Sequence, residues 1–434
     1  MTQSNTFRNF VTAAGAAAVL AGGSSFAGDY GKVVIDDKAP IECAPDPAFC
    51  DIFDAGELYS GGGFVSSVSI VGRYHGQFQS NSLRLDSGEN YNADYWEHRR
   101  LRLGTSIEFA NGWEFFNNWN ISDGQGSDAA NEEAFEGDFW GSIDEMYLKG
   151  KISGVGIQIG KQKQKVTREF STSSKRILTV ERSHIVNEVA DKKPWGVQFS
   201  GEAIGMKHKV GFWLGGYEND ADGEGKQFPG FRDGVRGSIS YNLEKELTDA
   251  TSLFLDYVYT NNSSGLASPG GSNDESALSS YNHVVALGTE STWDIDACRE
   301  WGLITDLIWG IDRESDGETF AGSGDAMPDG EDTFGVVLLG HYDITEKLEL
   351  VGKYAYASTS RLQRPQRRDN RDAGLDIPRF NMEDVHTFYA GLNYRICGDN
   401  LKLMAGYEYL TGELYGTGNG ITGDSWVLGI RTYF

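Results

Sequence analysis

Two short stretches of the sequence carry closely spaced basic side chains. They are Lys161, Lys163 and Lys165 in "GKQKQKV", and Arg99, Arg100 and Arg102 in "EHRRLRL". Lysine supplies a compact positive charge, and the guanidinium of arginine supplies a fork of donors that matches an oxyanion. Such side chains attract anions when they line a confined aqueous path. We therefore expect anion chemistry wherever the fold brings these stretches together.

The elements that must position these residues are β-strands. Residues 64–78 and 95–109 alternate apolar side chains with polar ones, and Arg73 lies on the polar face. A barrel with lipid outside and a wet lumen inside gives each face its partner. On a regular strand Arg100 points to the lumen and Arg99 points outward, so both can line one lumen only if the strand is bulged.

The lysine stretch conflicts with regular strand geometry in the same way. Continued alternation would place Lys161 and Lys163 on the same face as Ile157 and Ile159, which is the lipid side. Regular geometry must therefore end near Gly160, because the strand either leaves the membrane there or bulges and turns the lysines into the lumen.

Sixteen strands are predicted in all, and short turns alternate with long polar loops between them. The strands are residues 64–78, 95–109, 112–122, 139–152, 156–167, 195–205, 206–216, 234–244, 251–261, 281–294, 301–312, 332–345, 348–359, 385–397, 401–412 and 425–434. An even number of strands with one short-turn rim is typical of an all-β, transmembrane antiparallel β-barrel. The last strand carries Trp426 at one end and Tyr433 and Phe434 at the other, as expected at two membrane interfaces.

Three parts follow along the chain. Residues 1–27 have a charged start, a short apolar run and small residues before Ala27, which predicts a signal peptide. Residues 28–63 lack alternation and are predicted to form a periplasmic N-terminal segment. Residues 64–434 form the predicted outer-membrane β-barrel.

The third long loop is the only predicted departure from strands. Residues 171–190 place Ile177, Val180 and Ile185 at helical spacing. We expect this loop to contain a short helix and to fold inward, narrowing a pore. The alternative is a loop that lies flat on the outer rim.

The four cysteines suit an oxidising compartment. Cys43 and Cys50 bracket "APDPAF" and could close a small disulfide loop, whereas Cys298 and Cys397 lie far apart in polar turns. Spacing leaves open whether the second pair is bridged. The chain has no zinc-type Cys/His spacing, so we predict no metal site and no cofactor.

The net charge of −25 argues against a nucleic-acid partner, which needs a concentrated basic face. The acids crowd the loops at residues 218–225, 312–318 and 324–332. Further acids fall on predicted lumen faces, namely Asp256, Glu290, Glu349 and Glu408. An acidic lumen would weaken any preference for anions.

Three stretches taken in order resemble the phosphate-selective porin O and P family of outer-membrane channels. They are "RRLRLGTSIEF" (99–109), "DEMYLKGKISGVGIQIGKQKQK" (144–165) and "STSSKRILTVERSHIVNEVADKKPWGVQFSG" (171–201). The resemblance covers most of residues 64–434 and implies homotrimers of sixteen-stranded barrels, in which basic residues guide anions to a constriction made partly by the third loop. It implies anion-guiding roles for Arg99, Arg100, Lys161 and Lys163 and, by weaker matches, for Arg176 and Arg182; alternation adds Arg73 and Arg102 as lumen residues.

These observations predict a porin of the bacterial outer membrane, surrounded by lipid, that passes ions and small hydrophilic solutes. Selectivity for anions or phosphate is the expectation from the resemblance, and a weakly selective porin is the alternative from the lumen acids. A second alternative is a structural or adhesive surface protein with acidic loops and little conductance. The chain has no GxSxG or HExxH motif, so we predict no enzyme.

Overall fold

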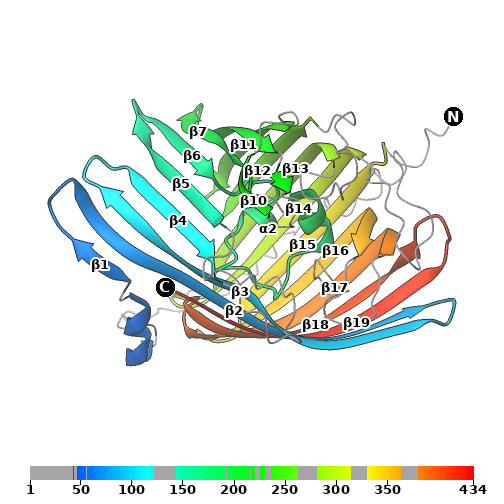
Figure 1. The fold of residues 1–434 in the computed structure, drawn as a ribbon. Coiled ribbons are helices and arrows are strands. Elements are labelled where there is room, and N and C mark those ends of the chain that lie inside the picture. Colours follow the sequence, from blue (N-terminus) through cyan, green and yellow to red (C-terminus); the bar gives the residue numbers. More distant parts are fainter. Residues whose placement is uncertain are drawn as a thin grey trace, which may run out of the picture. The chain divides into compact units, whose positions relative to one another are not determined.

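An antiparallel sheet closes on itself to form a barrel (Figure 1). The structure, a computed structural model, describes residues 43, 46–54, 56–121, 143–190, 193–215, 217–219, 225–229, 236–261, 281–313, 330–362 and 380–434. All of these residues belong to one unit, Cys43–Phe434. The predicted signal peptide and most residues of the acidic loops lie outside the described ranges.

The barrel strands are β2 (Val65–Leu85), β3 (Asn90–Phe109), β4 (Glu114–Asn120), β5 (Ile143–Ile152), β6 (Val155–Lys161), β7 (Trp195–Ala203), β8 (Met206–Gly215), β11 (Arg236–Thr248), β12 (Thr251–Thr260), β13 (Tyr281–Asp294), β14 (Glu300–Arg313), β15 (Thr333–Asp343), β16 (Leu348–Leu362), β17 (Phe380–Cys397), β18 (Leu401–Leu414) and β19 (Gly420–Tyr433). Each strand pairs with its chain neighbour, and β19 closes the ring on β2. The prediction of sixteen antiparallel strands in a closed barrel is confirmed.

Further short elements accompany the barrel. The 3₁₀ helix η1 (Ala48–Asp54) and strand β1 (Glu57–Ser60) precede it, and β9 (Tyr217–Asn219) pairs with β10 (Gly225–Pro229) in the loop after β8. Two helices, α2 (Arg168–Ser171) and α3 (His184–Ala190), lie in the loop between β6 and β7. In the described ranges, none of the helices has the length and apolar character needed to cross a membrane.

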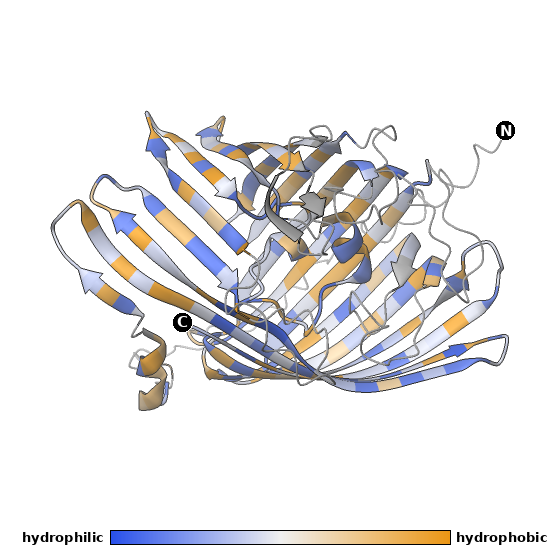
Figure 2. Ribbon diagram, in the orientation of Figure 1, coloured by the Kyte–Doolittle hydropathy of each residue, from blue (hydrophilic) through white to orange (hydrophobic). Residues whose placement is uncertain are grey.

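The outer wall is apolar, as the alternation predicts. Outward residues such as Leu350, Phe388 and Leu428 are 46%, 48% and 53% exposed, and Figure 2 shows apolar and polar residues alternating along the strands. The inner wall is polar along β2, where Gln77 and Gln79 are buried. Along β13–β16 the inner wall carries many apolar residues, such as Val284 and Ile308, beside polar ones such as Asp306 and Lys353.

Several strands extend farther than predicted. β2 continues to Leu85, β17 begins at Phe380 and β19 begins at Gly420. The ladders of backbone hydrogen bonds persist there. Above the lipid the outer face no longer needs to be apolar, so the sequence signal ends before the strand does.

Gly160 ends the regular geometry of β6, as the lysine pattern requires. Its φ of 136° is in the region that favours glycine, and a Cβ at this position would collide with the carbonyl of Met146. Lys161 then turns inward, and its Nζ donates to the Ile143 carbonyl at 2.6 Å. The glycine therefore lets the chain turn its basic residues away from lipid.

The predicted Cys43–Cys50 loop was wrong. Cys43 is bonded to Cys298 and Cys50 to Cys397, with Cα atoms 5.5 Å apart in each pair. Sequence spacing favoured the nearest partners, but only the folded barrel shows that residues 255 and 347 positions apart meet at the rim of short turns.

Gly160→Ala should lower the free energy of unfolding by about 1–3 kcal/mol, because alanine cannot adopt this φ without strain. Urea titration of the protein in detergent micelles measures the change. Gly201→Ala in β7 is the matched control, since a Cβ there meets no atom within 4 Å. Equal stability of the two variants would contradict the role of Gly160.

Candidate functional site

The described residues of the segment between β6 and β7, 162–190 and 193–194, lie inside the barrel. Their backbone carbonyls accept hydrogen bonds from side chains on four successive strands, β16 to β19. The bonds are Lys402 Nζ to Ile177 (3.2 Å), Asn393 Nδ2 to Leu178 (2.8 Å), Arg431 Nη2 to Val180 and Lys353 Nζ to Glu181 (3.0 Å). The wall therefore holds this inner loop along its middle, and a loop lying flat on the outer rim is excluded.

Both helices of the inner loop are also fixed to the wall. The carboxylate of Asp306 on β14 accepts from the backbone N–H groups of Arg168 (2.7 Å) and Glu169 (2.9 Å) at the start of α2. Glu188 in α3 accepts from Arg313 Nη1 at 2.5 Å and from Ser360 Oγ at 2.7 Å. These anchors leave the loop little freedom to swing out of the lumen.

Apolar packing also fixes α3 to the wall. Ile185, Val186 and Val189 of α3 are buried in a cluster with inward residues of β13–β16, including Val284 and Ile308. Burying a valine or isoleucine side chain stabilises by about 1.5–3 kcal/mol. The helix thus fills the β13–β16 side of the lumen and directs the polar side of the loop toward β2, β3 and β19.

The arginines of β3 face the lumen because the strand is bulged. His75 of β2 lies opposite Arg100 and Gly76 lies opposite His98, so Arg99 is the extra residue of a β-bulge. This extra residue lets two consecutive arginines point inward. Arg99 Nε then pairs with Glu181 of the inner loop at 2.8 Å.

The bulge also moves a histidine. Regular alternation from Arg100 would place His98 on the lumen face, but His98 lies outside, where its Nδ1 is 2.9 Å from the hydroxyl of Tyr74 and its ring contacts Trp96. The residues of β3 before Arg99 face the side opposite to the one that regular alternation predicts. A one-residue shift in a strand moves every side chain beyond it to the other face of the sheet.

Arg73, Arg100 and Arg431 form a group of guanidinium side chains around His75. Arg100 Nη1 is 3.4 Å and Arg431 Nη1 is 3.3 Å from His75 Nδ1, which must be the acceptor because a guanidinium only donates. Arg73 Nη1 donates to Ser174 Oγ at 2.5 Å, and Arg431 Nη1 donates to the Ser174 carbonyl at 3.1 Å. We call these three arginines the arginine cluster.

No carboxylate pairs with the arginine cluster among the residues that the structure describes. The nearby lumen acids are committed elsewhere: Glu181 pairs with Arg99, Asp144 with Arg102 (2.8 Å) and Lys193 (2.5 Å), and Glu169 with Lys353 (3.8 Å). Arg73 Nε is buried without a hydrogen-bond partner. The cluster is therefore a positive site with donor capacity to spare, in which Arg431 is buried and Arg73 and Arg100 are half-buried, and whose charge Glu181 offsets only in part.

The lysines of the inner loop add to this positive field. Lys163 Nζ donates to the carbonyls of Phe170 and Thr172. Burial, together with the charge of Lys209, lowers the pKa of Lys165 to about 8, and burial with Arg73 and Arg176 lowers the pKa of Lys175 to about 8. Both lysines can therefore lose their charge in mildly alkaline solution.

The carboxylate of Glu181 stays ionised at neutral pH. Burial opposes its ionisation, but the charges of Arg99 and Arg100 and the hydrogen bond from Arg99 more than offset burial and lower the pKa of Glu181. This acid ties the loop to β3 and neutralises Arg99. Arg99 is consequently less available to an anion than the arginine cluster.

The remaining predicted site residues are dispersed around the cluster. Arg182 donates to the carbonyls of Glu169 (3.2 Å) and Thr172 (2.9 Å) and braces the loop. Lys175, which is not one of the predicted site residues, has its Nζ 4.6 Å from the ring centre of Tyr433. Arg176 and Tyr433 interact through a side-chain hydrogen bond, which places the tip of the loop near the C-terminus of the barrel. The sequence alone missed Arg431 as a partner of Arg100, because only barrel closure brings β19 beside β2.

Asp306→Ala should loosen the inner loop, because it removes both acceptors at the start of α2. We expect a larger single-channel conductance with more current noise in planar bilayers. Asp424→Ala is the control, since Asp424 lies on the outer face and accepts from Tyr407. Unchanged conductance and noise in Asp306→Ala would show that Asp306 does not hold the loop.

The chain is similar to a known protein family and to several solved structures. The family described as phosphate-selective porin O and P matches residues 68–432. An anion-selective porin from Comamonas acidovorans is similar with a TM-score of 0.51 and 13% identity, over 85% of this chain and 99% of that chain. Salmonella typhi OmpF, solved in complex with daunomycin, is similar with a TM-score of 0.50 and 11% identity, over 87% of this chain and 100% of that chain.

No curated protein matches the chain. The structural similarities, at these identities, support the fold. The family match covers nearly all of the barrel, from β2 to the end of β19. The chain is a β-barrel channel of the bacterial outer membrane, and it belongs to the phosphate-selective porin O and P family.

Proposed function

We propose that this porin prefers anions and binds phosphate or a related oxyanion at the arginine cluster. The observation that carries the proposal is the group of three guanidiniums, the buried Arg431 and the half-buried Arg73 and Arg100, which has no carboxylate at ion-pair distance in the described part of the chain. Glu181, which already pairs with Arg99, offsets only part of this charge, and an oxyanion would supply a further partner. The hydroxyl of Ser174 adds a neutral hydrogen-bonding group beside it.

Two of the predicted lumen acids oppose this preference little, because they are paired with cations. Glu349 pairs with Arg395 and Glu290 pairs with Arg168, whereas Asp256 accepts from the neutral amide Nδ2 of Asn242 at 2.8 Å. A carboxylate held by a cation contributes little net field at a distance. The net positive field of the inner loop and β2 therefore governs the path.

Membership of the family also supports a homotrimer embedded in outer-membrane lipid, and a channel rather than an enzyme. The apolar outer residues Leu350, Phe388 and Leu428 suit contact with acyl chains. The structural or adhesive alternative is favoured by one observation, the apolar packing of α3 across part of the lumen. An absence of conductance in bilayers would support that alternative.

Arg73→Gln should weaken block of chloride current by phosphate about tenfold, because a charged hydrogen bond contributes roughly 1.5–3 kcal/mol. The reversal potential in a salt gradient should move toward cation preference. Arg84→Gln is the matched control, because Arg84 lies on the same strand and is exposed, beyond the cluster. If both variants behave as the unmodified channel does, the cluster is not the anion site.

Anion preference should fall as the pH rises from 7 to 9. Lys165 and Lys175, whose pKa values lie at about 8, are cationic below this pH and neutral above it. Reversal potentials at a series of pH values measure the effect. Lys175→Gln should flatten part of the curve, and a preference that is constant from pH 6 to 9 would contradict the role of these lysines.

A further inference from the structure

The described residues between Cys43 and Ser60 run along the rim of short turns, and we call them the rim strap. They contact three successive turns of the barrel. Cys43 is bonded to Cys298 after β13, Asp46 lies 3.6 Å from Lys347 after β15, and Cys50 is bonded to Cys397 at the end of β17. The strap then ends in β1, which pairs with β2.

The strap crosses the place where the barrel closes. Pairing of β19 with β2, which we call the seam, joins the two ends of the barrel chain. This ladder stops at the C-terminus, where Gly72 and Phe434 exchange two backbone hydrogen bonds (3.1 and 3.2 Å). Below Gly72 the same edge of β2 pairs with β1, from Ser69 opposite Glu57 to Ser67 opposite Ser60. β1 and β19 therefore follow one another along a single edge.

The Cys50–Cys397 bond makes this arrangement a covalent ring. The chain continues from Cys50 through β1 into β2, while Cys397 ends β17 on the other side of the seam. A covalent path thus joins β2 to β17 and bypasses β18 and β19. The Cys43–Cys298 bond closes a second and longer covalent path, from β2 back through the strap to the turn after β13. Without these two bonds, only noncovalent contacts hold the seam closed, and its ends are separated by almost the whole barrel sequence.

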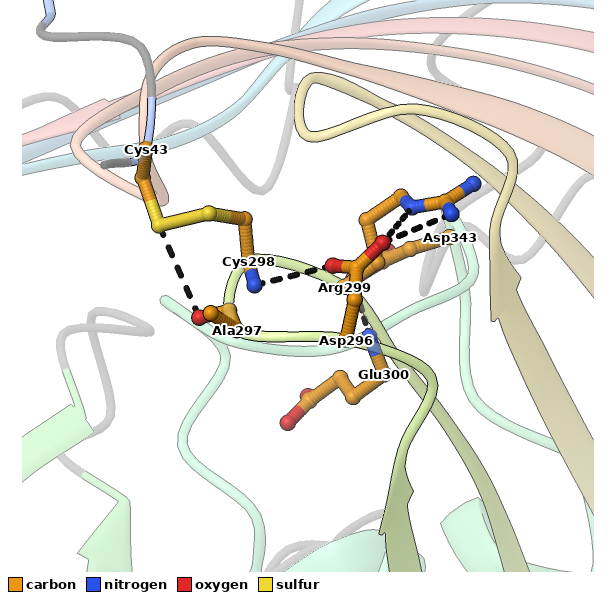
Figure 3. Close-up of a disulfide and its surroundings, with 7 residues drawn as sticks. All are labelled: Cys43, Asp296, Ala297, Cys298, Arg299, Glu300 and Asp343. Carbon is orange, nitrogen blue, oxygen red and sulfur yellow. Dashed lines mark hydrogen bonds and ion pairs between the residues drawn. A yellow bond between two sulfur atoms is a disulfide. The ribbon is translucent and has the colours of Figure 1, made fainter. Parts of the chain in front are cut away.

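The turns that receive the strap are held in place by their own hydrogen bonds. Asp296 accepts from the backbone N–H of Cys298 (3.0 Å) and from Arg299 Nε (2.8 Å), as Figure 3 shows. Arg299 Nη1 reaches the next turn and donates to the Ile344 carbonyl at 3.2 Å. Both the Cys43 and the Asp46 contacts therefore fall on turns that are already fixed to one another.

We propose that the rim strap is a covalent lock on the seam. The Cys50–Cys397 bond is the shorter tether that keeps β2 beside β19. The Cys43–Cys298 bond is a longer tether across the same seam and, with the Asp46–Lys347 pair, holds the start of the strap against the rim. Cross-linking segments far apart in the sequence limits the opened states most strongly. The lock acts on the lifetime of the barrel and leaves the anion path unchanged.

Two variants separate the lock from a general effect of losing a disulfide. The first replaces all four cysteines by serine (Cys43→Ser, Cys50→Ser, Cys298→Ser and Cys397→Ser) and leaves the seam without a covalent crossing. The second, Cys43→Ser with Cys298→Ser, removes the longer crossing and keeps the shorter one, Cys50–Cys397. The rate of unfolding on heating in dodecyl sulfate should rise about tenfold or more in the first variant and less than about threefold in the second. Equal rates in the two variants, or a larger effect of the second, would overturn the proposal.

Reduction of the folded, unmodified protein covers the case in which a variant does not assemble. A water-soluble phosphine delivers two electrons per disulfide, two protons from water give two thiols, and the phosphine becomes its oxide. Unfolding should accelerate as in the first variant, while phosphate block stays unchanged. If fully reduced barrels, verified by thiol alkylation, unfold at the original rate, the strap is no lock.

Discussion

Closure of the sheet is the constraint on which the rest of the structure depends. In hydrocarbon each backbone N–H and C=O must find a partner within the protein, so a sheet that crosses the membrane can have no free edge. Here β19 pairs with β2 over thirteen residues, from Ile421 to Tyr433. Closure creates an enclosed lumen, and it also brings Arg431 from the end of the chain beside His75 near its start.

The lumen is shaped by a loop rather than by the strands alone. Apolar residues of α3 pack on the inner wall of β13–β16, while side chains from β16–β19 bind the loop carbonyls. These two kinds of contact have different consequences. The packing fills one side of the lumen. The carbonyl contacts hold several basic side chains in place, and the basic side chains of the arginine cluster have no carboxylate at ion-pair distance among the described residues.

Local irregularities decide which side chains reach the site. The bulge at Arg99 lets neighbouring arginines point inward, and Gly160 turns the lysine stretch away from lipid. Both features were predictable as conflicts, because regular alternation would have placed a charge in lipid at each position. Which change in geometry occurs at each position was not predictable, since a bulge and an early end of the strand would each remove the charge from lipid.

The sequence by itself determined the sixteen alternating strands, the loop that folds inward and the basic residues of the lumen, because alternation and charge are local properties that the membrane enforces on each strand. Only the tertiary structure decided the partners of the cysteines, the outward position of His98 and the meeting of Arg73, Arg100 and Arg431. These depend on register and on ring closure, which place residues hundreds of positions apart in contact, and no local pattern in the chain encodes such distances.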